Sequence, residues 1–136
     1  MEVLKKLKGI FSYETPRILL IEDASIIAES IARILLDISP SALLHVPKSY
    51  NEVKECLKSG TYDLVLLDNS LTGWSDAAGM SGIKTIPLIR ETNPRTFILF
   101  ISNEIGVGKI LMQEGMVDFW KYKNELEGLL EELKTL

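Results

Sequence analysis

The chain has 136 residues, of which 46% are hydrophobic and 25% charged, so it is long enough for one well-buried domain and too short for two. Its net charge of −4, with Lys and Arg scattered along the sequence, argues against direct nucleic-acid binding. No aliphatic run approaches the roughly 20 residues that span a bilayer, and the single cysteine, Cys56, cannot form an internal disulfide, so we expect a cytoplasmic protein without a membrane partner.

The first predicted element is a short amphipathic helix over residues 1–11. Its apolar positions recur at helical spacing and are Val3, Leu7, Ile10 and Phe11. Lysines interrupt them, so the segment lacks the continuous apolar stretch of a secretory signal. We expect this helix to pack on the domain or on a second copy of the chain, and a membrane-surface helix is the weaker alternative. Residues 1–15 then form an N-terminal extension, and residues 16–136 form the main domain.

Short aliphatic runs alternate with amphipathic stretches along the rest of the chain. Strands are expected at residues 17–21, 42–46, 62–68, 96–101 and 117–120. Helices are expected after them at residues 25–36, 49–60, 83–91, 105–114 and 125–136. This alternation predicts an α/β fold with a flavodoxin-like, doubly wound sheet of five parallel strands, in the order 2-1-3-4-5 and with helices on both faces.

Two of the predicted helices contain residues that oppose helix formation. Pro87 removes a hydrogen bond from an interior turn, so the regular helix there is expected only from about Thr85. Gly106 and Gly108 each cost about 1 kcal/mol relative to alanine, which predicts a soft helix at residues 105–114.

Carboxylates stand at the ends of two strands that this order makes neighbours. Glu22 and Asp23 follow the first strand, and Asp68 ends the third. Each pair repels by about 4 kcal/mol at about 4 Å if the effective dielectric constant is near 20, so a cation must offset the charge. Mg²⁺ suits an all-oxygen site, and an acid beside it can act as the nucleophile in phosphoryl transfer.

Five motifs lie in a specific order along the chain. They are Arg-Ile-Leu-Leu-Ile-Glu-Asp at 17–23, Tyr-Asp-Leu-Val-Leu-Leu-Asp-Asn-Ser-Leu at 62–71, Gly-Met-Ser-Gly-Ile at 79–83, Phe-Ile-Leu-Phe-Ile-Ser at 97–102, and Gly-Met-Val-Asp-Phe at 115–119. Together they resemble the receiver domain of two-component response regulators. The resemblance implies that Asp68 accepts a phosphoryl group from a sensor histidine kinase or a phosphotransfer protein, and that the Ser102 hydroxyl bonds a phosphoryl oxygen. The Mg²⁺ ligands that it implies are Glu22, Asp23, Asp68 and the backbone carbonyl of Ser70.

The lysine that binds the phosphoryl group in this family has no single counterpart here, because a tyrosine stands at its place between two lysines. Counted without gaps from the last motif, its place is taken by Tyr122, and Phe119 matches the aromatic residue that changes rotamer on activation. A shift by one residue assigns the lysine role to Lys123 and the aromatic role to Trp120, although such a slip exchanges the faces of a strand unless a bulge absorbs it. We predict Lys123 in this role, with Lys121 as the other possibility.

Three further departures from the family surround the predicted site. Asn124 replaces a proline that usually follows the lysine with a cis bond, so a trans bond is expected. Asn103 stands where a small residue is usual and is expected to shield or bond the phosphoryl group. The connection after Asp68 contains about six extra residues, at 73–78, well beyond the roughly 2–6 residues of an ordinary strand-to-helix loop. This insertion is expected to gate access to the site or to select a partner.

We therefore predict a stand-alone receiver domain that is phosphorylated on Asp68 in a Mg²⁺-dependent reaction and signals by contact with a downstream protein, with a homodimer as a possible form. It is not expected to be an enzyme beyond slow self-dephosphorylation. The alternative is a degenerate receiver that acts as a phosphorylation-independent interaction module. A dehalogenase-type phosphatase would need a second Asp where Ser70 stands, and a dinucleotide-binding fold would need a Gly-x-Gly-x-x-Gly motif that the sequence lacks.

Overall fold

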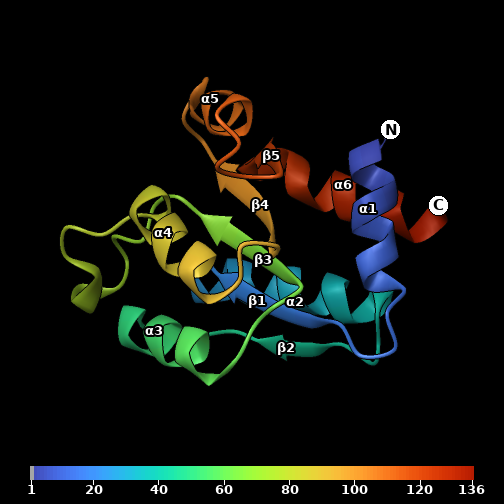
Figure 1. Cartoon of the computed structure of the whole chain (residues 1–136), viewed down its shortest axis with the longest axis horizontal. Helices are drawn as coiled ribbons and strands as arrows, with labels where there is room; N and C mark the ends of the chain where they lie inside the picture. The colour runs from blue at the N-terminus through green and yellow to red at the C-terminus, as the bar shows by residue number, and fades with distance from the viewer. Residues whose placement is uncertain (1) are drawn as a thin grey trace.

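The computed structural model describes residues 2–136 and places a parallel sheet between two layers of helices (Figure 1). The strands are β1 (Arg17–Ile21), β2 (Leu43–His45), β3 (Leu64–Asp68), β4 (Phe97–Ser102) and β5 (Phe119–Tyr122). The α-helices are α1 (Glu2–Phe11), α2 (Ser25–Ile38), α3 (Tyr50–Ser59), α4 (Gly82–Thr92), α5 (Val107–Gln113) and α6 (Leu126–Thr135). Two 3-10 helices complete the chain, η1 (Ser75–Ala77) and η2 (Lys123–Glu125).

The strands follow the order β2-β1-β3-β4-β5, and all neighbours are parallel. The flavodoxin-like order predicted from the sequence is therefore confirmed. Ile21 at the end of β1 pairs with Leu67, one residue before the end of β3. Because both strands run the same way, the residues that follow them meet at one edge of the sheet.

Each face of the sheet has its own hydrophobic core. Helices α1, α2 and α6 cover one face, and α3, α4 and α5 cover the other. All five residues of β3 are buried. Burial on both faces explains why this strand has no polar position before its terminal acid.

Helix α1 buries its apolar side within this chain. Leu7, Ile10 and Phe11 belong to the core formed with α2 and α6, and the Lys8 ammonium donates a hydrogen bond to the Leu133 carbonyl at 3.1 Å. Of the alternatives that the sequence left open for this helix, the structure shows packing on the domain. Within residues 2–136, no helix is both long and apolar enough to cross a membrane.

The expected late start of α4 is wrong, because the helix begins at Gly82 and contains Pro87. The first turn is capped from two directions. The Ser81 hydroxyl accepts a hydrogen bond from the third helical amide at 3.2 Å, and Asn69 accepts from the first two amides at 2.9 and 3.2 Å. These bonds satisfy amides that a helix start otherwise leaves unpaired, so the helix forms ahead of the proline.

Two boundaries near the C-terminal end also differ from the prediction. Strand β5 covers Phe119–Tyr122 instead of residues 117–120. Helix α5 is shorter than residues 105–114, because Gly106 has a φ of 84° and serves as its N-cap. Only Gly108 of the two glycines therefore lies inside the helix.

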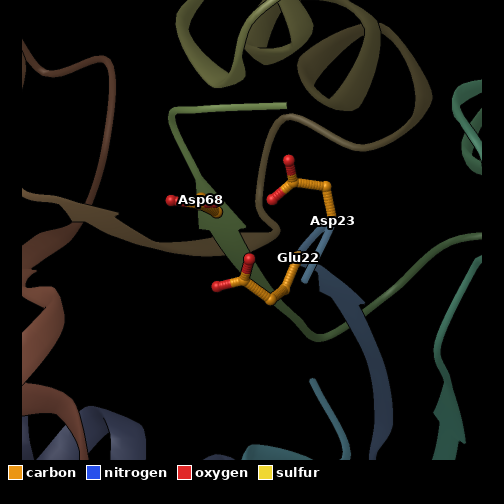
Figure 2. A group of neighbouring side chains, drawn as sticks. All are labelled: Glu22, Asp23 and Asp68. Carbon is orange, nitrogen blue, oxygen red and sulfur yellow. The ribbon is translucent and has the colours of Figure 1, made fainter. Parts of the chain in front are cut away.

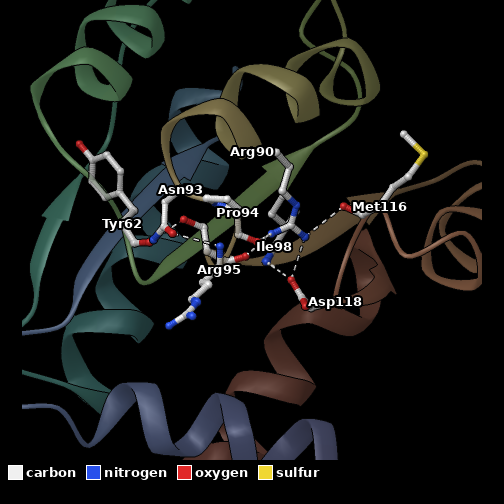
Figure 3. Close-up of polar contacts among 9 residues, drawn as sticks. Tyr62, Arg90, Asn93, Pro94, Arg95, Ile98, Met116 and Asp118 are labelled. Atoms are coloured by element: carbon white, nitrogen blue, oxygen red, sulfur yellow. Dashed lines mark hydrogen bonds and ion pairs between the residues drawn. The ribbon is translucent and has the colours of Figure 1, made fainter.

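Arg90, in the last turn of α4, joins this helix to the starts of β4 and β5 (Figure 3). Its guanidinium donates to four acceptors, which are the carbonyls of Pro94 (3.0 Å), Thr96 (2.6 Å) and Met116 (3.2 Å) and the carboxylate of Asp118 (3.1 Å). The Asp118 carboxylate also accepts from the Ile98 amide at 2.8 Å. Because these contacts hold Asp118 directly before Phe119, they fix where β5 begins to pair with β4.

Candidate functional site

Three carboxylates converge at the C-terminal edge of the sheet (Figure 2). Glu22 and Asp23 directly follow β1, and Asp68 is the last residue of β3. Each offers a carboxylate oxygen, and these three atoms lie within 4.8 Å of one another. Glu22 and Asp68 are buried, whereas Asp23 is partly exposed. The structure thus brings together the three side chains that the sequence predicted as metal ligands.

The Lys123 ammonium lies against two of these acids. Its Nζ atom is 3.2 Å from Asp68 Oδ2 and 3.2 Å from Glu22 Oε1. Lys123 is the first residue of η2, where the chain has left β5, so the alternation of faces along the strand no longer decides where its side chain goes. Lys121 instead lies over the Phe119 ring, with Nζ 5.7 Å from the centroid. Of the two candidate lysines, Lys123 is therefore the one that lies beside Asp68.

The two candidate aromatic residues of β5 lie in different cores. Phe119 packs against the core of α1, α2 and α6, whereas Trp120 packs against the core that includes α5. A Cβ atom added to Gly108 of α5 would lie 2.7 Å from Trp120 Cβ, so the glycine lets the helix approach the tryptophan closely. Trp120, three residues before Lys123, is thus the aromatic residue in contact with α5.

Ser102 ends β4, next to the strand that carries Asp68. Asp68 pairs with Ile101, so Ser102 extends one residue farther along the same edge. The Ser102 hydroxyl is buried and accepts a hydrogen bond from the Glu104 amide at 3.0 Å, which leaves its own proton free to be donated. Ser70 is exposed in the connection after β3, where its hydroxyl lies 3.4 Å from that of Thr72.

Burial of acidic groups dominates the electrostatics of the cluster. Burial and repulsion from Asp68 raise the pKa of Glu22 to about 7, against the opposing effects of the Ala24 amide and Lys123. Burial also raises the pKa of Asp68, although Lys123 opposes that shift. Burial lowers the pKa of Lys123, but the two carboxylates outweigh it and the net shift is upward.

The donor set fits a hard divalent cation such as Mg²⁺. Glu22 Oε1 is buried and has no hydrogen-bond partner within residues 2–136, although Lys123 Nζ lies 3.2 Å away without hydrogen-bond geometry. The cluster thus contains three acidic side chains, and one ammonium group pairs with two of them. A cation would supply the missing positive charge and occupy the unpaired oxygen.

Mg²⁺ affinity is expected to fall about tenfold between about pH 8 and about pH 6, because Mg²⁺ must displace the proton that Glu22 holds below its raised pKa of about 7. The raised pKa of Glu22 also stabilises the folded, metal-free protein below pH 4.5, and this contribution to the folding free energy is lost as the pH rises to about 7. Calorimetric titration at both pH values measures the affinity. Glu22→Gln should bind Mg²⁺ more weakly than the wild type at both pH values and should show no pH dependence. Equal Mg²⁺ affinities of the wild type at the two pH values would contradict the assignment of Glu22 as a ligand.

An apolar groove of about 530 Å³ opens beside Lys123 and Asn103, between α2 and the start of α6. Ile26 and Ile27 of α2 contribute to its lining and are 82% and 40% exposed. The groove therefore offers exposed apolar surface next to the acidic cluster.

The inserted residues 73–78 border the site, as the sequence predicted. The Gly73 amide donates a hydrogen bond to Asp23 Oδ2 at 2.6 Å. The segment continues into η1, and Trp74 is buried. Sequence reasoning missed the Gly73 contact, because it uses a backbone amide that any residue except proline has.

Comparison with known proteins assigns the chain to one family. A family model described as the response regulator receiver domain matches residues 18–134. Among solved structures, the response regulator TrrA of Thermotoga maritima in complex with Mg²⁺-BeF is 23% identical, has a TM-score of 0.64, and matches over 87% of this chain and 98% of its own.

Two further solved structures show the same likeness. A CheY-like receiver domain protein of Methanospirillum hungatei JF-1 is 15% identical, with a TM-score of 0.64 and coverage of 89% and 98%. The receiver domain of Francisella response regulator 1452 is 18% identical, with a TM-score of 0.65 and coverage of 88% and 97%. No curated protein matches the sequence. At these identities, the solved structures support the fold alone.

Proposed function

This chain belongs to the response regulator receiver domains, and from that membership we propose that it accepts a phosphoryl group on Asp68 in a Mg²⁺-dependent reaction. Receiver domains are signalling domains of two-component systems. The observation that carries the proposal is the buried Asp68 carboxylate, which lies beside two further acids and 3.2 Å from the Lys123 ammonium.

The proposed reaction is phosphoryl transfer from a phosphohistidine of a kinase or phosphotransfer protein. A carboxylate oxygen of Asp68 forms a bond to phosphorus, and the phosphorus–nitrogen bond breaks with its electron pair left on the histidine. Glu22, Asp23, Asp68 and the Ser70 carbonyl would hold Mg²⁺, which neutralises charge on the transferred group when bound. Lys123 would donate to a phosphoryl oxygen from its place beside Asp68, and Ser102 would do so from the neighbouring strand.

The proposed output is a change in the surface around α5. A phosphoryl group adds up to about two negative charges, which attract the Ser102 hydroxyl and the Lys123 ammonium. Trp120 of β5 lies against Gly108 of α5, so a shift of β5 would reach the helix. The exposed Ile26 beside the site supports a protein as the phosphoryl donor, and the signal would pass on by protein–protein contact.

Intact-mass measurement after incubation with Mg²⁺ and a small phosphodonor tests the proposal. The wild-type chain should gain the mass of one phosphoryl group, and the gain should be absent without Mg²⁺. Asp68→Asn is the matched control, because it keeps the shape of the side chain and removes the nucleophile. No gain in the wild type would leave the phosphorylation-independent interaction module as the function.

A further inference from the structure

The segment from Thr72 to Ala78 contacts the acidic cluster through its backbone. The Gly73 amide donates to Asp23 Oδ2 at 2.6 Å, so one oxygen of this carboxylate is held by the segment and the other is left for a ligand. A Cβ atom added to Gly73 would lie 2.6 Å from the same oxygen and 3.2 Å from Asp23 Cγ. Only a glycine therefore fits at this position without moving Asp23.

Buried apolar side chains hold the middle of the segment in place. Trp74 and Ala77 belong to the core on the face of α3 and α4, with exposed fractions of 9% and 4%. Trp74 also lines a small cavity of about 140 Å³ together with Glu22 and Asp23. Two buried side chains thus fix the segment beside the acidic cluster, while its other residues are exposed.

Asp76 joins the segment to the start of α3. Its two carboxylate oxygens accept hydrogen bonds from the amides of Tyr50 and Asn51, at 2.9 and 2.8 Å, and these bonds lower the pKa of Asp76. Both amides belong to the first turn of α3, which otherwise has no intrahelical partner for them. A negative charge is also favourable at this end of a helix.

These contacts form one path from the acidic cluster to α3. We propose that residues 72–78 are a positioning element of the metal site, in which Gly73 orients Asp23 and Asp76 keeps Gly73 in place. This inference rests on the proposed function, because it assumes that Asp23 is a Mg²⁺ ligand. Binding of Mg²⁺ and docking of the segment on α3 then stabilise each other, since coupling between two sites is reciprocal.

Two variants test the coupling by the Mg²⁺ dissociation constant, measured by calorimetry on the full chain. Gly73→Ala displaces Asp23 directly and should weaken binding about tenfold or more, as changes to groups that orient metal ligands do. Asp76→Asn leaves the acidic cluster untouched and should weaken binding about fivefold. The controls are Gly128→Ala, where a Cβ atom has no neighbour within 4 Å, and Glu91→Gln, which removes an exposed charge; both should bind as the wild type does.

Hydrogen exchange at the Tyr50 and Asn51 amides measures the same coupling at the start of α3. Mg²⁺ should slow exchange at these amides about fivefold in the wild type and leave it unchanged in Gly73→Ala. Wild-type Mg²⁺ affinity in Asp76→Asn, together with unchanged exchange in the wild type, would overturn the inference and leave the proposed function intact. A wild-type chain that binds no Mg²⁺ would overturn both the inference and the proposed function. Circular dichroism of each variant shows whether it is folded, so that weak binding is not mistaken for misfolding.

Discussion

Lys123→Ala is expected to lower the free energy of unfolding of the metal-free protein by about 3 kcal/mol, because it leaves buried acids without their cation. The side chains of Asp68 and Glu22 are 2% and 1% exposed, and the Lys123 ammonium is 3.2 Å from each. Denaturant unfolding measures the loss. It should be larger near pH 8 than near pH 6, because Glu22, with a pKa of about 7, carries a proton at the lower pH.

Mg²⁺ is expected to restore most of this stability and to bind Lys123→Ala more tightly than the wild type, since the ammonium no longer competes for the same oxygens. Lys121→Ala is the matched control, because Lys121 lies over the Phe119 ring and has no ion pair within residues 2–136. It should unfold and bind Mg²⁺ as the wild type does. A larger stability loss in Lys121→Ala than in Lys123→Ala would show that Lys121, and not Lys123, neutralises the buried acids.

Leu7→Ala is expected to destabilise the protein by about 2 to 5 kcal/mol, the usual cost of truncating a fully buried leucine. Leu7 is 0% exposed and belongs to the same core as α2 and α6, although it lies outside the predicted main domain. The midpoint of denaturant unfolding should fall with an unchanged slope. Lys5→Ala, on the exposed side of α1, should change the stability by less than about 0.5 kcal/mol. A small loss in Leu7→Ala would show that α1 unfolds separately.

The fold was predictable because its main strands are unambiguous. The runs that become β1, β3 and β4 are buried on both faces, and such strands read as continuous aliphatic sequence. The alternation with helical stretches then leaves few topologies. Placing Glu22, Asp23 and Asp68 at one edge required only the strand order, so the acidic cluster could be predicted as well.

The details that were missed depend on contacts between distant residues. The start of α4 depends on Asn69, whose amide side chain and carbonyl cap a helix that begins thirteen positions later. The placement of β5 at Phe119–Tyr122, instead of residues 117–120, depends on the contacts of Asp118 with Arg90 and Ile98. The capping of α3 by Asp76 joins residues 25 and 26 positions apart. Local sequence patterns carry no signal for such contacts.

The two outer strands of the sheet, β2 and β5, are its shortest. Strand β2 has three residues and β5 has four, whereas β1 and β3 have five and β4 has six. A short edge strand offers few free amides and carbonyls to an incoming strand, which is one way in which proteins avoid edge-to-edge aggregation. Concentrated solutions of this protein should therefore resist fibril formation by sheet extension, and any self-association is expected to use helical surfaces.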